Sequence, residues 1–288
     1  MDSGDLRIFQ MVARTGSITQ AADRLGYVQS NVTARIRQLE AELGTVLFHR
    51  HNRGMTPTSS GIALLAYADR ILRLMDEAFQ SVASSSEPRG PLAIGSTQSC
   101  AAVRLPKLLA DYHRKYPDVQ LSLLTGNSAR MTESVLRCEV DGAFVSDPVL
   151  SEELEAIPAF EEELVLVCRE DCRSLGDAAA SPLLVFSGGC TYRAVLEQWL
   201  RENRWKPPQT MEFGTLETIL GGVEAGLGVS LLPRSLISAQ TARRLAVFRL
   251  PDRYSRSTTF FVRRKDAFVS CPLRLFIELL PSAEAQRA

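Results

Sequence analysis

The sequence predicts an α/β protein that carries an all-α unit at its N-terminus. Apolar residues recur at helical spacing in the first part of the chain, whereas short apolar runs alternate with amphipathic segments after residue 90. A stretch rich in serine, proline and glycine at residues 84–91 separates the two patterns. With 288 residues, the chain is too long for one small domain. We therefore expect a small helical unit, a linker and a larger α/β domain.

The segment from Ser17 to Leu43 has the pattern of two helices joined by a tight turn. Ser17 and Gln20 predict a capping box at the start of the first helix, and Gly26 is suited to its end because glycine accepts positive φ. The inward stripe expected in the second helix is Val32, Ile36, Leu39 and Leu43. A preceding helix over residues 5–15 completes a three-helix core through Leu6, Phe9, Val12 and Ala13.

The outward face of the second helix is suited to the major groove of DNA. In a helix-turn-helix the N-terminal part of the second helix touches base edges, and glutamine, asparagine and arginine can form paired hydrogen bonds there. The predicted base contacts are Gln29, Ser30, Asn31, Thr33 and Ala34. A helical hairpin with an ordinary polar surface is the alternative.

A turn-rich basic segment follows at residues 48–58. Arg50 and Arg53 lie at its expected tip, which is typical of a wing laid along the DNA backbone or minor groove. Together with Arg37 they are the predicted contacts to phosphates or the minor groove. Residues 1–60 hold seven arginines against five acidic residues, although the whole chain has no net charge. DNA affinity must therefore be local, and a solvated basic loop is the alternative to a wing.

A long helix is predicted from Thr58, which can cap it, to about Ser84. Its apolar residues alternate at three- and four-residue steps, as in a coiled-coil seam, so we expect it to pair with its copy in a homodimer. Such pairing would hold two recognition helices at the roughly 34 Å separation of successive major grooves. The predicted seam is Leu65, Ala68, Leu72, Met75, Phe79 and Val82.

The remainder of the chain alternates strands and helices. Strands are expected at residues 92–95, 119–124, 142–145, 163–169, 182–186, 211–213, 229–232 and 258–262, and helices at 103–116, 131–138, 192–203, 216–225 and 272–280. This order predicts two similar lobes joined by crossing strands, with a ligand cleft beyond the C-terminal ends of the strands. Lobe I is expected at about 91–162 and 266–288, and lobe II at about 163–265.

Polar residues at the strand ends predict a small-molecule site in that cleft. The segment after the first strand opens a helix, whose free N–H groups favour an anion. The expected lining is polar but nearly uncharged, which suits a small carboxylate or another polar metabolite; solvated loop ends are the alternative. The predicted effector contacts are Thr97, Gln98, Ser99, Thr125, Asn127, Ser146, Ser187, Cys190 and Thr215.

Composition argues against other classes of protein. Apolar residues make up 45% and charged residues 23%, no apolar run could span a membrane, and no secretory pattern begins the chain, so we expect a cytoplasmic protein. Six cysteines are expected to stay reduced, and Cys168 and Cys172 provide too few ligands for a metal site. No cofactor motif, catalytic triad or phosphate loop is present, so an enzyme is not expected.

Several motifs together resemble the LysR-type transcriptional regulators of bacteria. They lie at residues 6–9, 16–22, 39–44, 47–50, 56–58 and 225–233 and span the full length. The resemblance implies a winged helix-turn-helix at 1–58, a dimerising linker helix and hinge at 59–90, and an effector-binding domain of periplasmic-binding-protein type at 91–288. It also implies a homotetramer built from two dimers on double-stranded promoter DNA, whose promoter occupancy changes with a small-molecule effector. RNA polymerase is a candidate partner.

Two positions bear on how closely the chain follows this family. The recognition helix of such regulators usually begins with a serine or threonine cap, whereas Val28 stands here. Either Ser30 caps a helix that starts later, or the end is left to water and DNA phosphate. Cys190 lies near the reactive cysteine of the peroxide-sensing branch, so a thiol- or peroxide-responsive regulator is the alternative function. No resolving cysteine follows Cys190 shortly afterwards.

Overall fold

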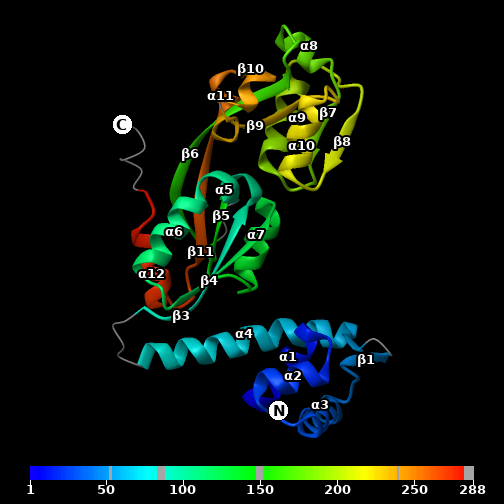
Figure 1. The fold of residues 1–288 in the computed structure, drawn as a ribbon, viewed down its shortest axis with the longest axis vertical. Helices are drawn as coiled ribbons and strands as arrows, with labels where there is room; N and C mark the ends of the chain where they lie inside the picture. The colour runs from blue at the N-terminus through cyan, green and yellow to red at the C-terminus, as the bar shows by residue number, and fades with distance from the viewer. Residues whose placement is uncertain (52–53, 83–87, 147–151, 239, 282–288) are drawn as a thin grey trace. The chain divides into compact units, whose positions relative to one another are not determined.

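The computed structural model describes residues 1–51, 54–82, 88–146, 152–238 and 240–281. Within α4, the side chains at positions 73, 76, 77 and 80–82 lie outside this description, as does Arg53 at the expected tip of the wing. The chain divides into two compact units, one built on the N-terminal helices and wing and the other on the α/β domain (Figure 1). Each unit is described by itself below.

The N-terminal unit is a winged helix-turn-helix. Its elements are α1 (Ser3–Thr15), α2 (Ile18–Leu25), α3 (Gln29–Leu43), β1 (Phe48–His51), β2 (Gly54–Pro57) and α4 (Ser59–Val82). The strands form an antiparallel hairpin in which Phe48 faces Pro57. Phe9 of α1 is fully buried, and its ring centroid lies 5.2 Å from that of Phe48. One apolar core therefore holds the three helices and the base of the wing together.

Helices α1 and α2 begin and end at residues that are suited to capping. Asp2 and Asp5 form a capping box at the start of α1, and Ser17 accepts a hydrogen bond from the amide of Gln20 at 3.3 Å. The capping box predicted for α2 is only half formed, because the amide of Ser17 donates to Thr15 Oγ1 at 3.4 Å. Gly26 ends α2 in the left-handed conformation, as expected, with φ of 68°.

The inward stripe of α3 is shorter than predicted. Val32, Ile36 and Leu39 are buried in the core, but Leu43 is 41% exposed. Leu43 is the last residue of the helix, where Gly44 reverses the chain in a left-handed conformation. The prediction that Leu43 packs inward was therefore wrong, because the core ends one turn earlier.

Helix α4 contributes one of its faces to the same core, which corrects the predicted seam. Thr58 Oγ1 accepts from the amide of Gly61 at 3.0 Å, so the predicted cap is present. Ala68 and Leu72 are buried in the core, and Leu65 packs against it. Ala68 and Leu72 are consequently covered by their own unit and are not available for a seam with a second helix, whereas Leu65 is only partly covered.

A second apolar stripe on α4 is exposed instead. Tyr67 and Leu74 are more than half exposed, and Ile71 is 37% exposed. Phe79 of the predicted seam is also exposed, but it lies two turns after Leu72 on the same side of the helix as that residue. Of the other residues predicted for the seam, Met75 is half-buried and the side chain of Val82 lies outside the described residues. Asp69 accepts from Gln10 Nε2 at 2.5 Å and from Arg14 at 3.1 Å, which attaches the inner side of α4 to α1.

The second unit is built on a seven-stranded mixed sheet. The strand order is β10-β6-β11-β5-β3-β4, with β9 also paired to β6, and a separate parallel pair joins β7 and β8. The strands are β3 (Gly90–Thr97), β4 (Val119–Gly126), β5 (Gly142–Ser146), β6 (Leu154–Arg169), β7 (Leu183–Phe186), β8 (Thr210–Phe213), β9 (Ser230–Pro233), β10 (Leu245–Arg249) and β11 (Arg256–Arg264).

Helices cover this sheet in both lobes. They are α5 (Gln98–Val103), α6 (Leu105–Lys115), α7 (Ser128–Leu136), α8 (Leu175–Ala179), α9 (Thr191–Glu202), α10 (Leu216–Glu224), α11 (Asp252–Ser255) and α12 (Cys271–Glu278), with short 3-10 turns η1 (Arg234–Leu236) and η2 (Thr241–Arg243). The helix predicted over 103–116 corresponds to α6, and a separate short helix, α5, precedes it and ends at Val103. The helix predicted over 131–138 begins earlier, at Ser128.

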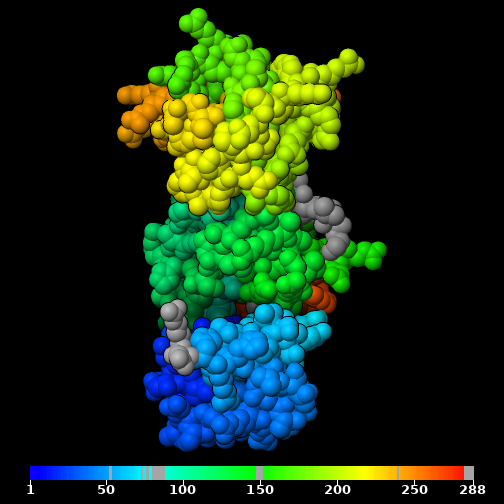
Figure 2. Space-filling model, turned by 90° about the vertical axis from the view of Figure 1, so that its right-hand side faces the viewer, coloured from blue at the N-terminus to red at the C-terminus, as the bar shows by residue number. Residues whose placement is uncertain are grey.

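Two long strands join the lobes (Figure 1). β6 pairs with β11 as far as Glu163 and with β9 and β10 from Leu164 onward, so it changes partners in mid-strand. β11 also pairs with β5 of lobe I over Thr259–Val262. The lobe II boundary expected at about residue 265 therefore needs correction, because β11 lies in the sheet of lobe I. Figure 2 shows lobe II, in yellow, resting on lobe I, in green.

Candidate DNA-binding face and effector cleft

The predicted base contacts lie on the solvent-facing side of α3. Gln29, Ser30, Asn31 and Ala34 are exposed, and Arg37 follows on the same side of the helix. Thr33 is half-buried, and its hydroxyl donates to the carbonyl of Gln29 at 2.9 Å. The face thus offers short side chains around an amide-bearing pair, a shape that permits close approach to base edges.

The start of α3 has no side-chain cap. Val28 occupies the N-cap position in an extended conformation and is 68% exposed. Its carbonyl accepts from the amides of Asn31 and Val32, at 3.0 and 3.3 Å. Of the two alternatives for this end, the helix therefore begins directly after Val28. The amides of Gln29 and Ser30 have no intrahelical acceptor, because they belong to the first turn.

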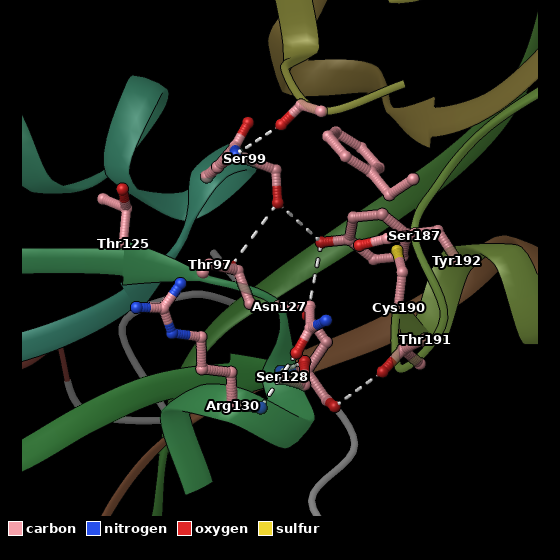
Figure 3. Close-up of a pocket in the computed structure, with 15 residues that line it drawn as sticks. Thr97, Ser99, Thr125, Asn127, Ser128, Arg130, Ser187, Cys190, Thr191 and Tyr192 are labelled. Atoms are coloured by element: carbon pink, nitrogen blue, oxygen red, sulfur yellow. Dashed lines mark hydrogen bonds between the residues drawn. The ribbon is translucent and has the colours of Figure 1, made fainter. Parts of the chain in front are cut away.

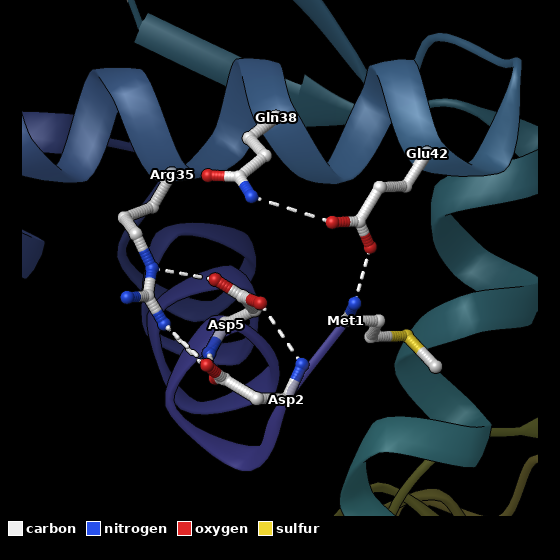
Figure 4. Close-up of polar contacts among 6 residues, drawn as sticks. All are labelled: Met1, Asp2, Asp5, Arg35, Gln38 and Glu42. Atoms are coloured by element: carbon white, nitrogen blue, oxygen red, sulfur yellow. Dashed lines mark hydrogen bonds and ion pairs between the residues drawn. The ribbon is translucent and has the colours of Figure 1, made fainter.

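Side chains of α3 also attach this helix to the start of α1 (Figure 4). Arg35 donates to both carboxylate oxygens of Asp2, at 2.9 and 3.1 Å, and its Nε lies 2.5 Å from Asp5 Oδ1. Glu42, two turns further on, pairs with the amino group of Met1. The pKa of Asp2 is lowered, first because the backbone amide of Asp5 donates to it and further because Arg35 lies beside it. These ion pairs hold the angle at which α3 presents its outer face.

The wing is also attached to the helical core at the start of β2, close to its tip. The amide of Met55 donates to the carbonyl of Gly16 at 2.8 Å. Gly54 has a φ of 131°, and a Cβ there would lie 2.4 Å from the same carbonyl oxygen, so only glycine fits. Arg50 is exposed on β1, whereas Arg53 lies outside the described residues. The exposed side chain of Arg50 thus extends from a hairpin that is attached to the core through Met55, its strand partner.

In the α/β unit a cavity of about 210 Å³ lies between the lobes, and Figure 3 shows it with its lining residues. Loops after β3, β4 and β5 contribute one wall, and the start of α9 contributes the other. Eight of the nine predicted effector contacts line it: Thr97, Gln98, Ser99, Thr125, Asn127, Ser146, Ser187 and Cys190. Thr215 does not line it, because its hydroxyl caps α10 by accepting from the amide of Thr218; Gly214 lines the cavity in its place.

Hydrogen bonds cross the cavity from one lobe to the other. Gln98 donates through Nε2 to the carbonyl of Gly214 at 2.9 Å, and its Oε1 accepts from the amide of Leu216 at 3.2 Å. Asn127 donates to the carbonyl of Gly188 at 2.8 Å, and Thr191 donates to that of Ser146 at 2.9 Å. The lobes are therefore closed on each other by polar side chains of the pocket itself.

A cluster of hydroxyl groups forms the deepest part of the lining. The Tyr192 hydroxyl lies 3.3 Å from both Ser99 Oγ and Ser146 Oγ, and Ser99 Oγ lies 3.5 Å from Thr97 Oγ1. Burial raises the pKa of Tyr192 to about 12, so its hydroxyl keeps its proton. A neutral cluster of this kind can both donate and accept hydrogen bonds.

Arg130 and Tyr192 also line the pocket, and the sequence did not single out either. Arg130 lies in the first turn of α7, and its side chain extends along the cavity wall (Figure 3). The lining was expected to be polar but nearly uncharged, and Arg130 is its one charged side chain among the described residues. The described lining contains no aspartate or glutamate. Extending the rule of polar strand ends by one helical turn would have found Arg130.

Cys190 occupies the N-cap position of α9 without a side-chain hydrogen bond. Burial raises the pKa of its thiol, although the amides of Arg193 and Tyr192 partly oppose this rise. The thiolate expected from the helix N-terminus is therefore disfavoured, because desolvation outweighs the backbone potential. All six cysteines are free thiols. These features do not favour the peroxide-responsive alternative.

Within the described parts of the chain, no group of three histidine, cysteine, aspartate or glutamate side chains is arranged to hold a metal ion. Among the same residues, no helix is long and apolar enough to span a membrane.

A winged helix-turn-helix combined with a two-lobed domain that closes on a polar cavity defines a ligand-responsive transcriptional regulator. Family models agree with this class. Residues 3–62 match the bacterial regulatory helix-turn-helix protein of the lysR family, and residues 85–284 match the LysR substrate binding domain. The chain belongs to the LysR family of transcriptional regulators, whose members bind promoter DNA and small-molecule effectors and form oligomers.

Relatives and solved structures extend along the whole chain. It is 54% identical over 292 residues to the uncharacterized HTH-type transcriptional regulator YusT of Bacillus subtilis, covering 100% of this chain and 99% of that protein. It is 43% identical to the HTH-type transcriptional regulator SoxR of an Arthrobacter species, covering 98% of both. Full-length CbnR in complex with its target DNA has a similar fold, with a TM-score of 0.71 at 23% identity, over 97% of this chain and 99% of that chain.

Proposed function

We propose that the outer face of α3 contacts bases through Gln29, Ser30, Asn31, Thr33 and Ala34, while Arg37, Arg50 and Arg53 contact phosphates or the minor groove. The exposure of the α3 face, on the side away from the buried Val32, Ile36 and Leu39, is the observation that carries this proposal. Short side chains there permit close approach, and Gln29 and Asn31 can form paired hydrogen bonds with adenine. Guanidinium groups supply contacts that depend on salt but not on sequence, and those of Arg37 and Arg50 are exposed.

Base and phosphate contacts can be separated by measuring affinity on several DNA sequences. Asn31→Ala should lose affinity on the preferred site selected from random duplexes, with little loss on unrelated DNA. Arg50→Ala should weaken binding to all sequences alike. Arg114→Ala, on α6 of the other unit, is the control. Equal losses on all sequences for Asn31→Ala would contradict its role at bases.

We further propose that the effector is a small monocarboxylate that lacks an ammonium group. Arg130 supplies one cation, and hydroxyl and amide groups fill the rest of the lining, so a single anionic group has a partner at one end of the cavity. An ammonium group would have no carboxylate to pair with there. The cavity of about 210 Å³ suits a compact ligand.

Matched ligand pairs test this effector class. Lactate and alanine, or benzoate and benzylamine, differ mainly in the charged group, and thermal shift of the full chain reports binding. A carboxylate at 100 times its dissociation constant would add about 2.7 kcal/mol of stability. Arg130→Met should abolish the shift, whereas Arg114→Met should keep it. Larger shifts with amines, or shifts that survive Arg130→Met, would contradict the proposal.

For the homodimer, we propose that the outer stripe of α4, formed by Tyr67, Ile71 and Leu74, replaces the predicted seam and pairs with the α4 of a second copy. These residues follow four- and three-residue steps, as in a coiled coil, and they are exposed on a helix whose other face is buried. Assembly of two such dimers into a tetramer and contact with RNA polymerase remain proposals from the family resemblance.

Substitutions of two leucines on α4 distinguish the predicted seam from the outer stripe. Leu74→Asp should give a folded protein with a smaller assembly mass by light scattering. Leu72→Asp should unfold the N-terminal unit, because it places a charge in the apolar core. If Leu74→Asp leaves the mass unchanged, the outer stripe is not the dimer contact.

A further inference from the structure

Glu162 is a buried carboxylate at the point where the two lobes meet. Its side chain is only 6% exposed. It lies on β6 directly before the residues at which that strand leaves β11 and begins to pair with β9. A charge in this position requires strong partners, because burial of an unpaired carboxylate is costly.

The two oxygens of Glu162 bind partners in different lobes. Oε1 accepts from Arg104 Nε at 2.7 Å, and Oε2 accepts from Ser235 Oγ at 2.8 Å. Arg104 lies at the end of α5 in lobe I, where it also stacks over the ring of Phe160 at 5.5 Å. Ser235 lies on η1, directly after β9 of lobe II. One carboxylate therefore links a helix of one lobe to a turn of the other.

Helix α5 connects this carboxylate to the cavity. Its C-terminal end is held by Arg104, and its N-terminal end carries Gln98 and Ser99, which line the pocket. Gln98 bridges to lobe II through Gly214 and Leu216. Since α5 is only six residues long, a change in the placement of Arg104 also moves Gln98.

We propose that Glu162 is a positioning residue for the effector cleft. By holding α5 against η1, it sets the distance between the lobes at which Gln98 reaches Leu216, and it thereby controls how readily the pocket closes. The assignment of the cleft to an effector rests on the function proposed above. The coupling between Glu162 and the cleft does not, since it concerns the protein without ligand.

Hydrogen exchange of the full chain without ligand tests the coupling. The amide of Leu216 donates to Gln98, so peptides that contain Leu216 report whether the lobes are closed. Glu162→Met should accelerate exchange in these peptides about tenfold, the effect of losing a charged hydrogen bond. Ser235→Ala should act in the same direction with a smaller effect. Glu163→Met is the matched control, because Glu163 makes only long ion pairs with Arg234 and Arg249 at the surface.

A conservative variant separates positioning from simple loss of stability. Glu162→Gln can still accept from Arg104 and donate to Ser235, so it should leave exchange at Leu216 close to the wild-type rate. Faster exchange confined to β6, α5 and η1 in Glu162→Met and Ser235→Ala would overturn the proposal. So would equal acceleration by Glu163→Met. If Glu162→Met fails to fold, Ser235→Ala and Glu162→Gln decide the question alone.

Discussion

The DNA-binding face and the effector cleft are built in different ways. The face of α3 is positioned by an apolar core that includes Phe9, Phe48 and Ile36, and none of its proposed base contacts takes part in that core. The cleft is closed by hydrogen bonds that its own lining side chains make across the lobes, such as those of Gln98 and Asn127. In the winged unit, one set of residues supports the site and another set is proposed to contact DNA. In the α/β unit, the same side chains close the cleft and line it.

This difference indicates which site can change shape. Disruption of an apolar core lowers the free energy of unfolding by several kcal/mol, so the DNA-binding face should keep its shape until the unit unfolds. A hydrogen bond across the cleft contributes only about 1 kcal/mol, and a ligand that competes for Gln98 or Tyr192 replaces it directly. The molecule therefore places its adjustable contacts in the cleft and its rigid ones behind α3.

The largest expected effect comes from the core of the winged unit. Phe9→Ala removes a fully buried ring that packs on Phe48, and it should destabilise this unit by about 3–5 kcal/mol. Chemical unfolding followed by circular dichroism would measure this loss. Phe268→Ala, at a ring that is 42% exposed in the other unit, should cost far less. Similar losses for both variants would remove the distinction between rigid support and exposed surface.

A smaller effect is expected at the ion pair behind α3. Arg35→Met leaves the buried Asp5 carboxylate without its cation and should cost about 2 kcal/mol. Arg14→Met, which removes an exposed pair with Asp69, should cost less than about 1 kcal/mol. Thermal unfolding of the two variants at pH 7 compares them directly, and equal costs would show that Arg35 does not hold the helix.

Asp2, which accepts from the amide of Asp5 and pairs with Arg35, makes the stability of the winged unit depend on acid. Because the pKa of Asp2 is lowered from its ordinary value of 3.8, its contribution is complete above that pH. It is lost as the pH falls through the lowered value. Wild type should therefore lose stability more steeply than Asp2→Asn below about pH 4. Parallel pH profiles for the two proteins would contradict the assigned pairing.

A substitution at Val28 should raise the stability of the winged unit rather than lower it. Val28→Thr would supply the missing side-chain cap of α3 and should stabilise the unit by about 1 kcal/mol. Differential scanning calorimetry would detect the higher midpoint. Val46→Thr, at another exposed valine outside a helix start, provides the control. An unchanged midpoint for Val28→Thr would mean that another group already satisfies the helix end.

Oxidation or substitution of Cys190 is expected to have the smallest effect, with no change in DNA affinity. Since burial raises the pKa of this thiol, it stays protonated near neutral pH and should react slowly with iodoacetamide. Low concentrations of peroxide should leave DNA affinity unchanged in wild type and in Cys190→Ser alike. A loss of affinity in wild type that Cys190→Ser prevents would restore the thiol-responsive alternative.

Periodicity in the sequence predicted the three helices of the winged unit because each has one apolar stripe. Periodicity gave the wrong inner face for α4, because this helix has two apolar stripes. Leu65, Ala68 and Leu72 form one stripe, and Tyr67, Ile71 and Leu74 form another, so spacing alone could not decide which faces the core. Packing against α1 decides it, and that contact depends on the tertiary structure.

The sequence predicted those cleft residues that lie at the ends of strands and in the loops that follow them. Strand ends located Thr97, Thr125 and Ser146 because parallel strands bring their C-terminal ends to one edge. Arg130 and Tyr192 lie inside helices, where an exposed arginine or a buried tyrosine looks ordinary. The first half of β6 was missed because the acidic run at residues 161–163 interrupts its apolar pattern, yet Glu162 is buried there by partners distant in sequence.

The separation of support and contact on α3 is tested most directly by the salt dependence of DNA binding. Arg37 and Arg35 lie two residues apart, but only Arg37 belongs to the exposed face. Fluorescence anisotropy with the DNA upstream of its own gene, at several salt concentrations, should show that Arg37→Ala lowers the salt slope by about 1 without changing thermal stability. An unchanged slope in Arg37→Ala, or a slope lowered only together with stability, would contradict the account.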